Sequence, residues 1–475
     1  MSVVSMILDK VGIRDVSLAQ ADDFERWFIN YLWDKYSEER MNKRIIVENQ
    51  IRDLNIRLTN GTVNKEYLQE IAIPSDLVKD IRIDGLEKLG LSSETIDDNK
   101  IIIKGKPVQA GDFDVKLCFK IKDWIEGEEI SCLMIPVAFN PDPRSLWKNI
   151  PTDRETTSFF KEDSVCDYIK VETKEGSEVR KDIVVASQRG RSHAQEGKPR
   201  DDHYNVFHCD ESGWYVLSVA DGAGSAKYSR KGSQIACDTV VDFCKEQLKS
   251  NEEFEAKIKD FQDAEDKATA QKVVGDMIYK ILGTAAHKAY KAINDFAVEK
   301  AATNADFAGV KTKDFATTLL LAICKKFDFG WFVATFWVGD GAICIYNADK
   351  NSFKLLGEPD EGEFSGQTRF LTMPEIFTDA TSFYKRLRFS IEDDFTALFL
   401  MTDGVSDPMF ETDVNLKSID KWHQLYNSLR SGFPEDQISG VMLTDDNEES
   451  KYQLLHWLDF WSPGNHDDRT IAILY

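Results

Sequence analysis

Three apolar segments of the chain are each followed, within two residues, by the dipeptide Asp-Gly. Such a pair can deliver a carboxylate to the end of a buried strand, and the glycine lets a ligand approach the backbone closely. A single Asp-Gly is most often only a hairpin turn, and that interpretation stays open for each pair taken alone. The segments are residues 214–220, 331–338 and 397–401, and the aspartates that follow them are Asp221, Asp340 and Asp403.

Two acidic pairs stand directly before further apolar strands. Asp201-Asp202 precedes residues 204–207, and Asp467-Asp468 precedes residues 470–474. Five carboxylate sites gathered at strand edges would repel one another unless cations lay between them. Oxygen ligands of this kind suit Mg²⁺ or Mn²⁺. The pattern therefore predicts a metal centre built from strand ends.

The composition limits the classes of partner. The chain has 475 residues, enough for two or three domains, and 42% of them are hydrophobic. Its 82 acidic residues outnumber the 59 basic ones and give a net charge of -23. This charge opposes binding to nucleic acid or to an anionic membrane through any broad surface.

The cysteines and the hydropathy indicate the compartment. None of the eight cysteines has a partner at Cys-x-x-Cys spacing, and several lie in apolar segments. We therefore expect reduced thiols inside the cores. The N-terminus has no signal pattern, and the sequence has no apolar stretch of membrane length. We expect a cytoplasmic protein.

Changes of periodicity divide the chain into four parts. Residues 1–59 are helical in pattern, and their aromatic stripe fits either a packed helix pair or a docking surface. Residues 60–140 contain short strands that predict a small all-β sandwich. Residues 141–181 combine prolines, charges and aromatics and indicate a linker that packs against something. Residues 182–475 form one larger domain.

Part of the sandwich region resembles a known module. The segment 103–107 followed by Ala-Gly-Asp-Phe at 110–113 and then a strand is similar to bacterial immunoglobulin-like modules. The resemblance covers only residues 60–140 and implies a binding or spacing role.

The order of strands and helices after residue 182 predicts the class of the larger domain. Strands come first, then two helical stretches at about 231–248 and 264–298, then strands again. This order fits two sheets flanked by helices, an α+β sandwich of αββα type.

The ordered set of motifs in residues 182–475 resembles the metal-dependent protein phosphatases of the 2C type, especially their bacterial branch. The set comprises an acidic pair before the first strand pair, Asp-Gly-x-Gly, Val-Gly-Asp, Thr-Asp-Gly, and an acidic pair followed by Thr and a last strand. The resemblance implies two Mn²⁺ or Mg²⁺ ions, with Asp340 matching a weaker third site. It also implies the following metal-site residues: Asp201, Asp202, Asp221, the Gly222 carbonyl, Asp340, Asp403 and Asp467.

The chain departs from the family pattern at several positions near this site, among them Asp201, where the family more often has Glu, and Ala223, where eukaryotic members often have His. The family usually has an arginine three residues after the early glycine to grip phosphate, but this chain has His193 after Gly190. Arg191 or Arg200 could supply the guanidinium, and His193 could grip phosphate, act as an acid or be structural. In the last motif, Asp468 stands where the family has asparagine.

The resemblance implies a phosphoprotein phosphatase that hydrolyses phosphoserine and phosphothreonine with a metal-activated water. Asp221 would bridge both ions. The partners of the protein would be phosphoproteins and, by analogy, a cognate serine/threonine kinase in bacterial signalling. Two alternatives remain: a catalytically weak pseudophosphatase that binds phosphoproteins or a kinase, and a two-metal phosphoesterase for small molecules.

Overall fold

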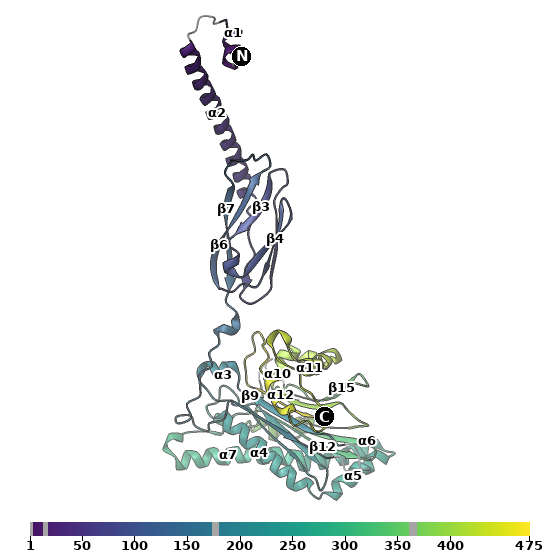
Figure 1. Ribbon diagram of the computed structural model, residues 1–475. Helices are drawn as coiled ribbons and strands as arrows, with labels where there is room; N and C mark the ends of the chain where they lie inside the picture. Colours follow the sequence, from purple (N-terminus) through teal and green to yellow (C-terminus); the bar gives the residue numbers. More distant parts are fainter. Residues whose placement is uncertain (1–2, 13–17, 173–179, 361–367) are drawn as a thin grey trace. The chain divides into compact units, whose positions relative to one another are not determined.

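The computed structural model describes residues 3–12, 18–172, 180–360 and 368–475, and they form two compact units (Figure 1). The first unit runs from Met1 to Leu146 and the second from Trp147 to Tyr475. No described helix is both long enough and apolar enough to cross a membrane.

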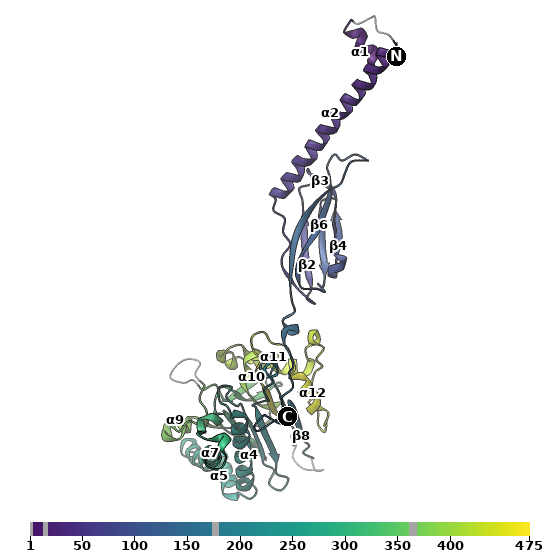
Figure 2. The same cartoon turned by 90° about the vertical axis from the view of Figure 1, so that its left-hand side faces the viewer.

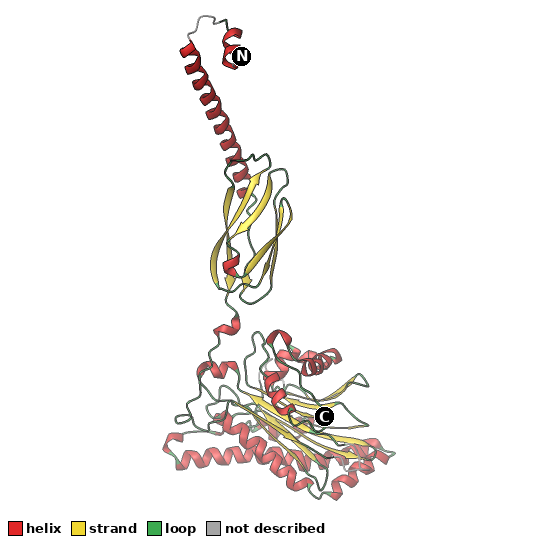
Figure 3. Cartoon of the chain, viewed as in Figure 1, coloured by secondary structure: helices red, strands yellow, loops and turns green. Residues whose placement is uncertain are grey.

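The first unit contains a long helix and two small sheets that enclose one core (Figure 3). The sheets have the strand orders β1-β7-β6-β3 and β2-β5-β4. Alternate side chains from both sheets, among them Ile71, Ile103 and Leu117, meet in the same core, so the unit is a β-sandwich. Its elements are α1 Val3–Lys10, α2 Leu18–Asp53, β1 Gly61–Thr62, β2 Tyr67–Ala72, β3 Val78–Asp84, β4 Leu91–Asp97, β5 Lys100–Gly105, β6 Gly111–Ile121 and β7 Ser131–Asn140.

Helix α2 is not half of a packed helix pair. Its last turns contribute Val47 and Ile51 to the sandwich core, and Arg40 and Arg44 bind glutamates of the loop before β7. In contrast, several large side chains farther up the helix stay exposed, among them Trp27, Tyr31 and Trp33, the last of which is 66% accessible. Periodicity alone cannot distinguish an apolar stripe that is covered from one that is not.

Two cysteines of the sandwich are joined, which corrects the expectation of reduced thiols throughout. Cys118 on β6 and Cys132 on β7 are directly paired in the antiparallel register and form a disulfide. Their separation of 14 residues gave no signal in the sequence because the register of the hairpin decides which residues face each other. The other six cysteines are free, and five of them are buried.

The second unit has two sheets packed face to face with helices on both outer sides, which confirms the predicted α+β fold (Figure 2). The five-stranded sheet has the order β10-β11-β12-β13-β16, and the six-stranded sheet has the order β15-β14-β17-β18-β9-β8. The strands are β8 Ser164–Ile169, β9 Ile183–Gln188, β10 His203–His208, β11 Tyr215–Ala220, β12 Leu319–Phe327, β13 Gly330–Val338, β14 Ala342–Asn347, β15 Ser352–Gly357, β16 Leu387–Glu392, β17 Ala397–Met401 and β18 Arg469–Leu474.

Helices cover the outer face of each sheet. Helices α4 to α7 pack on the five-stranded sheet, and α10 to α12 pack on the six-stranded one. The helices of this unit are α3 Arg191–Glu196, α4 Ser229–Leu248, α5 Glu252–Asp263, α6 Lys267–Ile278, α7 Thr284–Thr303, α8 Glu375–Thr378, α9 Ala380–Lys385, α10 Asp403–Phe410, α11 Ile419–Ser431 and α12 Ser450–Trp457.

The apolar strands build three stacked cores because successive side chains point to opposite faces of a sheet. In β11, Val216 contacts the helices, whereas Leu217 and Val219 face the other sheet. In β9, Val184 faces the helices and Val185 faces the sheets' common core. Burial on both faces explains why these strands are almost continuously apolar, and it holds their ends rigidly at one edge of the sandwich.

The second unit begins earlier than the linker predicted at 141–181 would allow. Strand β8 pairs with β9 along its whole length and is the edge of the six-stranded sheet. Upstream of it, Phe159 packs against Tyr228, Phe307 and Phe315. These aromatic contacts explain why the segment is richer in aromatic residues than a free linker would be.

Candidate metal centre

The register of the sheets brings the acidic strand ends together. Asp221 follows β11, and because His203 of β10 pairs with Ala220, the pair Asp201-Asp202 before β10 lies at the same edge. Likewise, Ile471 of β18 pairs with Met401 of β17. The start of β18, with Asp467-Asp468, therefore lies beside the end of β17, where Asp403 opens α10.

Asp221, Asp340 and Asp403 form the tightest acidic group at this edge. One carboxylate oxygen from each lies within 4.8 Å of the others, and all three residues are half-buried. Thr368 donates a 2.6 Å hydrogen bond to Oδ2 of Asp340, while the buried Oδ1 of Asp340 has no hydrogen-bond partner among the described residues. Burial and the neighbouring carboxylates raise the pKa of both Asp221 and Asp403 well above the ordinary value.

Asp202 extends this group from the side of β10. Its Oδ2 accepts hydrogen bonds from Thr402 and Thr470, at 2.9 and 2.6 Å, and its Oδ1 is buried without a protein partner. Burial, followed by the charge of Asp468, raises its pKa to about 7. The carboxyl is therefore held rigidly through one oxygen while the other remains available for a ligand.

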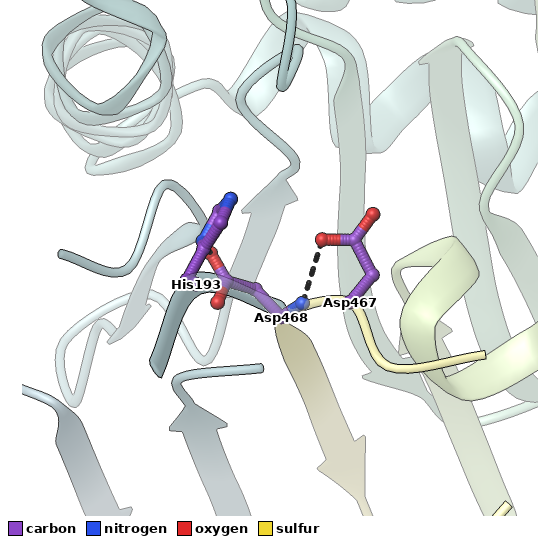
Figure 4. A group of neighbouring side chains, drawn as sticks. All are labelled: His193, Asp467 and Asp468. Atoms are coloured by element: carbon purple, nitrogen blue, oxygen red, sulfur yellow. Dashed lines mark hydrogen bonds and ion pairs between the residues drawn. The ribbon is translucent and has the colours of Figure 1, made fainter. Parts of the chain in front are cut away.

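His193, Asp467 and Asp468 form a second group beside the first (Figure 4). Nδ1 of His193 lies 3.0 Å from Oδ2 of Asp468, which also accepts from the backbone N–H of Asp201 at 2.5 Å. Oδ1 of Asp468 accepts from the backbone N–H of Gly190 at 2.6 Å. Asp468 thus ties the loop of His193 to the last strand, whereas Asp467 bonds only the N–H of its neighbour among the described residues.

The charge state of this second group follows from the same contacts. Burial by itself lowers the pKa of His193, but the charge and hydrogen bond of Asp468 outweigh it and raise the pKa to about 9. Burial would raise the pKa of Asp468, but His193 and the two backbone donors lower it. The pair is therefore an imidazolium and a carboxylate at neutral pH.

Among the described residues, Arg191 and Arg200 donate no hydrogen bond to a carboxylate of the acidic centre. Nη2 of Arg191 binds Oδ1 of Asp459 at 2.7 Å. Arg200 is almost fully buried and donates to the hydroxyl of Ser187 and to the carbonyl of residue 162. Of the three predicted phosphate-binding side chains, only His193 forms a hydrogen bond with the acidic groups in the described residues, and Arg200 lies near enough to Asp468 and Asp202 to feel their charges.

Asp201 and Gly222 were also predicted to belong to the metal site, and they lie in different parts of it. Asp201 forms an ion pair with Arg230, whose Nε lies 2.9 Å from its Oδ1, and its Oδ2 lies 3.9 Å from Nε2 of His193, so it lies on the side of the second group. Gly222 follows Asp221 and forms a β-bridge with Thr317. The backbone of Gly222 therefore lies next to Asp221 at the same strand end.

Two glycines allow the loops of the site to approach each other. A Cβ on Gly190 would lie 2.3 Å from the carbonyl carbon of Asp467, and a Cβ on Gly404 would lie 1.9 Å from the carbonyl oxygen of Asp468. Real Cβ atoms do not come so close to backbone atoms. Both positions require glycine for the acidic residues to converge.

Several residues that support the site were not identified from the sequence. Asp407 lies one turn after Asp403 on α10, and burial with the nearby Asp340 raises its pKa to about 6. Its four-residue spacing from Asp403 was a usable signal. The hydroxyls of Thr402 and Thr470 and the ammonium of Lys161 gave none, because their partners lie far away in the chain.

Solved structures that resemble the chain include two bacterial phosphatases and a magnesium complex of RsbX. A bacterial serine phosphatase is 14% identical, with 62% of this chain and 96% of that one covered and a TM-score of 0.34. The S. agalactiae serine/threonine phosphatase is 14% identical, with 62% of this chain and 98% of that one covered and a TM-score of 0.33. RsbX in complex with magnesium is 11% identical, covering 66% and 100%, with a TM-score of 0.32.

The comparison of sequences identifies the family. No curated protein matches the chain. The family profile described as protein phosphatase 2C matches residues 189–441, which span more than half of the chain and include most of the acidic centre. The chain therefore belongs to the protein phosphatase 2C family.

Proposed function

We propose that this chain is a metal-dependent phosphatase that removes phosphate from phosphoserine and phosphothreonine of proteins. The observation that carries the proposal is the convergence of Asp221, Asp340 and Asp403 within 4.8 Å. Three carboxylates at this distance are unfavourable without a cation between them.

The residues of the centre fit two or more hard divalent cations. The donor set consists of oxygens, which suits Mg²⁺ and Mn²⁺. The buried oxygens without a protein partner on Asp202 and Asp340 are free for a metal ion or its water. Asp221, Asp403, Asp467 and the Gly222 carbonyl would hold two ions, and Asp340 would serve a third.

When bound, the ions would supply a water activated as nucleophile and would neutralise charge on the phosphate. The protein's own contribution is to hold the ligands. Thr402 and Thr470 fix the orientation of Asp202, and Thr368 fixes that of Asp340. No cysteine or serine nucleophile is needed, because a water can attack directly.

His193 is the best candidate to bind the phosphate. Its Nδ1 faces Asp468, which keeps the ring protonated, and its Nε2 lies 3.9 Å from Oδ2 of Asp201, beyond hydrogen-bond distance, so the Nε2–H can donate to a phosphate oxygen. An imidazolium gives one charged hydrogen bond where an arginine gives two, so phosphate binding should be weaker and more dependent on pH.

The proposed partners follow from the charge of the chain and from this site. A net charge of -23 disfavours nucleic acid and anionic membranes, so the macromolecular partners would be phosphoproteins, including a serine/threonine kinase. The sandwich with its exposed helix α2 would contribute to the choice of partner.

The test is hydrolysis of p-nitrophenyl phosphate by the full chain, with and without Mn²⁺, followed by a choice between phosphopeptides and nucleotides. We expect Mn²⁺-dependent turnover that Asp221→Asn abolishes and that the exposed control Asp445→Asn retains. A folded chain that is inactive with every divalent ion but binds phosphopeptides would instead be a pseudophosphatase. Preference for nucleotides would indicate the small-molecule phosphoesterase.

A further inference from the structure

A segment outside the family match lies against the acidic centre. We call residues 147–163 the strap. Its first residues bind α3, since the N–H of Lys148 donates to Gln195 and the N–H of Ile150 donates to the carbonyl of Ala194, at 2.6 and 2.9 Å. Farther along, Phe159 is anchored in the aromatic cluster described above. The strap is thus fixed at two points on the second unit.

Between this anchor and β8, Lys161 reaches the acidic pair before β10. Its Nζ donates to the carbonyl of Asp202 at 2.9 Å, to the carbonyl of Asp201 at 3.2 Å and to Oγ of Ser233 at 2.9 Å. The Ser233 hydroxyl in turn donates to the carbonyl of Asp201 at 2.6 Å. An ammonium group has three N–H donors, and here all three have acceptors.

These contacts fix the backbone from which Asp202 projects. One oxygen of the Asp202 carboxylate is held by Thr402 and Thr470, and the free one is buried beside the Asp221 group. If the Asp201–Asp202 carbonyls lost their donors, the backbone could shift and the free oxygen would move with it. Outer partners of this kind are known to change the metal affinity of a site.

We propose that Lys161 of the strap is a positioning residue for the metal centre, which holds Asp201 and Asp202 in the geometry that binds divalent ions. This inference rests on the proposed metal-dependent function. If Lys161 has this role, the strap contributes to the metal site of the second unit, although the family match begins only at residue 189.

The experiment measures Mn²⁺ binding to the full chain by titration calorimetry and by the rise in melting temperature that Mn²⁺ causes. We expect Lys161→Met to weaken Mn²⁺ binding by about 10- to 100-fold. The half-saturating Mn²⁺ concentration for hydrolysis should rise by the same factor, while kcat at saturating Mn²⁺ changes less. Ser233→Ala, which removes one acceptor, should weaken binding by a smaller factor.

Two control variants separate positioning from general damage to the strap. Lys148→Met makes the same substitution at an exposed side chain of the strap and should leave Mn²⁺ affinity unchanged. Phe159→Leu weakens the aromatic anchor and should lower the melting temperature without changing Mn²⁺ affinity by more than about threefold.

Three results would overturn the inference. In the first, Lys161→Met binds Mn²⁺ as tightly as the wild type. In the second, Phe159→Leu weakens Mn²⁺ binding as much as Lys161→Met does, which would show that Lys161 is only one of several packing contacts of the strap. If Lys161→Met does not fold, an unchanged Mn²⁺ affinity in Ser233→Ala decides against the inference. A wild-type chain that binds no Mn²⁺ would instead refute the proposed function itself.

Discussion

Replacing Asp221 by asparagine should stabilise the metal-free protein and at the same time remove its response to metal. In the metal-free state Asp221 faces Asp403, Asp202 and Asp467, and these charges with burial raise its pKa well above the ordinary value. Asparagine has almost the same shape but no charge, so the substitution relieves the repulsion without leaving a cavity. The same change removes the ligand expected to bridge two ions.

The size of the effect follows from the spacing. Two unit charges no more than 4.8 Å apart repel by ~3 kcal/mol or more at an effective dielectric constant of about 20. Because shared protons already relieve part of this repulsion at neutral pH, we expect a net gain of about 1–2 kcal/mol. For a domain of this size that corresponds to a rise of about 2–6 °C in melting temperature.

The assay is differential scanning calorimetry of the full chain in EDTA and in Mn²⁺, with Asp445→Asn as the matched control. Asp445 belongs to another acidic group, with Asp182 and Asp446, but is exposed, so its replacement should change little. Asp221→Asn should melt higher than the wild type in EDTA and gain nothing from Mn²⁺. A variant that melts lower in EDTA, or that Mn²⁺ stabilises as much as the wild type, would refute the reasoning.

Three further predictions concern other groups. Cys132→Ser, or reduction of the disulfide, should destabilise the first unit by about 3 kcal/mol, because a bridge that closes a loop of this length restricts the unfolded chain. Calorimetry with and without reductant measures this loss of stability. A melting transition of the first unit that reductant leaves unchanged would contradict the disulfide. Because the pKa of His193 rises from 6.5 to about 9 on folding, its stabilising contribution is complete below pH 6.5 and is lost as the pH rises through about 9. Urea unfolding of metal-free His193→Gln should therefore vary less with pH over that window than that of the wild type, and an equally steep profile would show that the pair does not titrate this way. Arg191→Ala should leave the KM for p-nitrophenyl phosphate within about twofold of the wild-type value, because the partner of Arg191 is Asp459. His193→Ala should raise this KM. A large increase of KM in Arg191→Ala would indicate that Arg191 binds the phosphate.

The sequence was sufficient for the fold of the second unit and for the convergence of its carboxylates. Strands buried on both faces leave long apolar runs, and the ends of such strands meet at the edge of a sheet. The residues that make the centre rigid could not be predicted in the same way. The hydroxyl of Thr470 reaches Asp202 across 268 positions of the chain, and the ammonium of Lys161 reaches it across 41. Contacts of this kind depend on tertiary packing and have no periodic signature.

The choice among the three predicted phosphate-binding side chains shows why a motif was not enough. Arg191 and His193 are two residues apart on α3, and at 100° per residue their side chains leave the helix in nearly opposite directions. One of them had to face away from the acidic centre, but the sequence could not say which one. Because Gly190 lets the start of α3 pack closely against Asp467, His193 points toward the acidic centre and Arg191 points toward Asp459.

Two of the positions at which the chain departs from the family pattern, 193 and 468, are in contact with each other. His193 stands where the family usually has arginine, and Asp468 stands where it has asparagine, and the two side chains form the 3.0 Å pair beside Asp467. An arginine is charged whatever its neighbour is, but a half-buried histidine beside a neutral amide would lose its proton near neutral pH. The carboxylate of Asp468 stabilises the protonated ring, so the acidic residue at position 468 keeps the histidine at position 193 positively charged. Taken singly, each substitution would argue for a weakened enzyme; as a pair they preserve a cation where the phosphate is expected to bind.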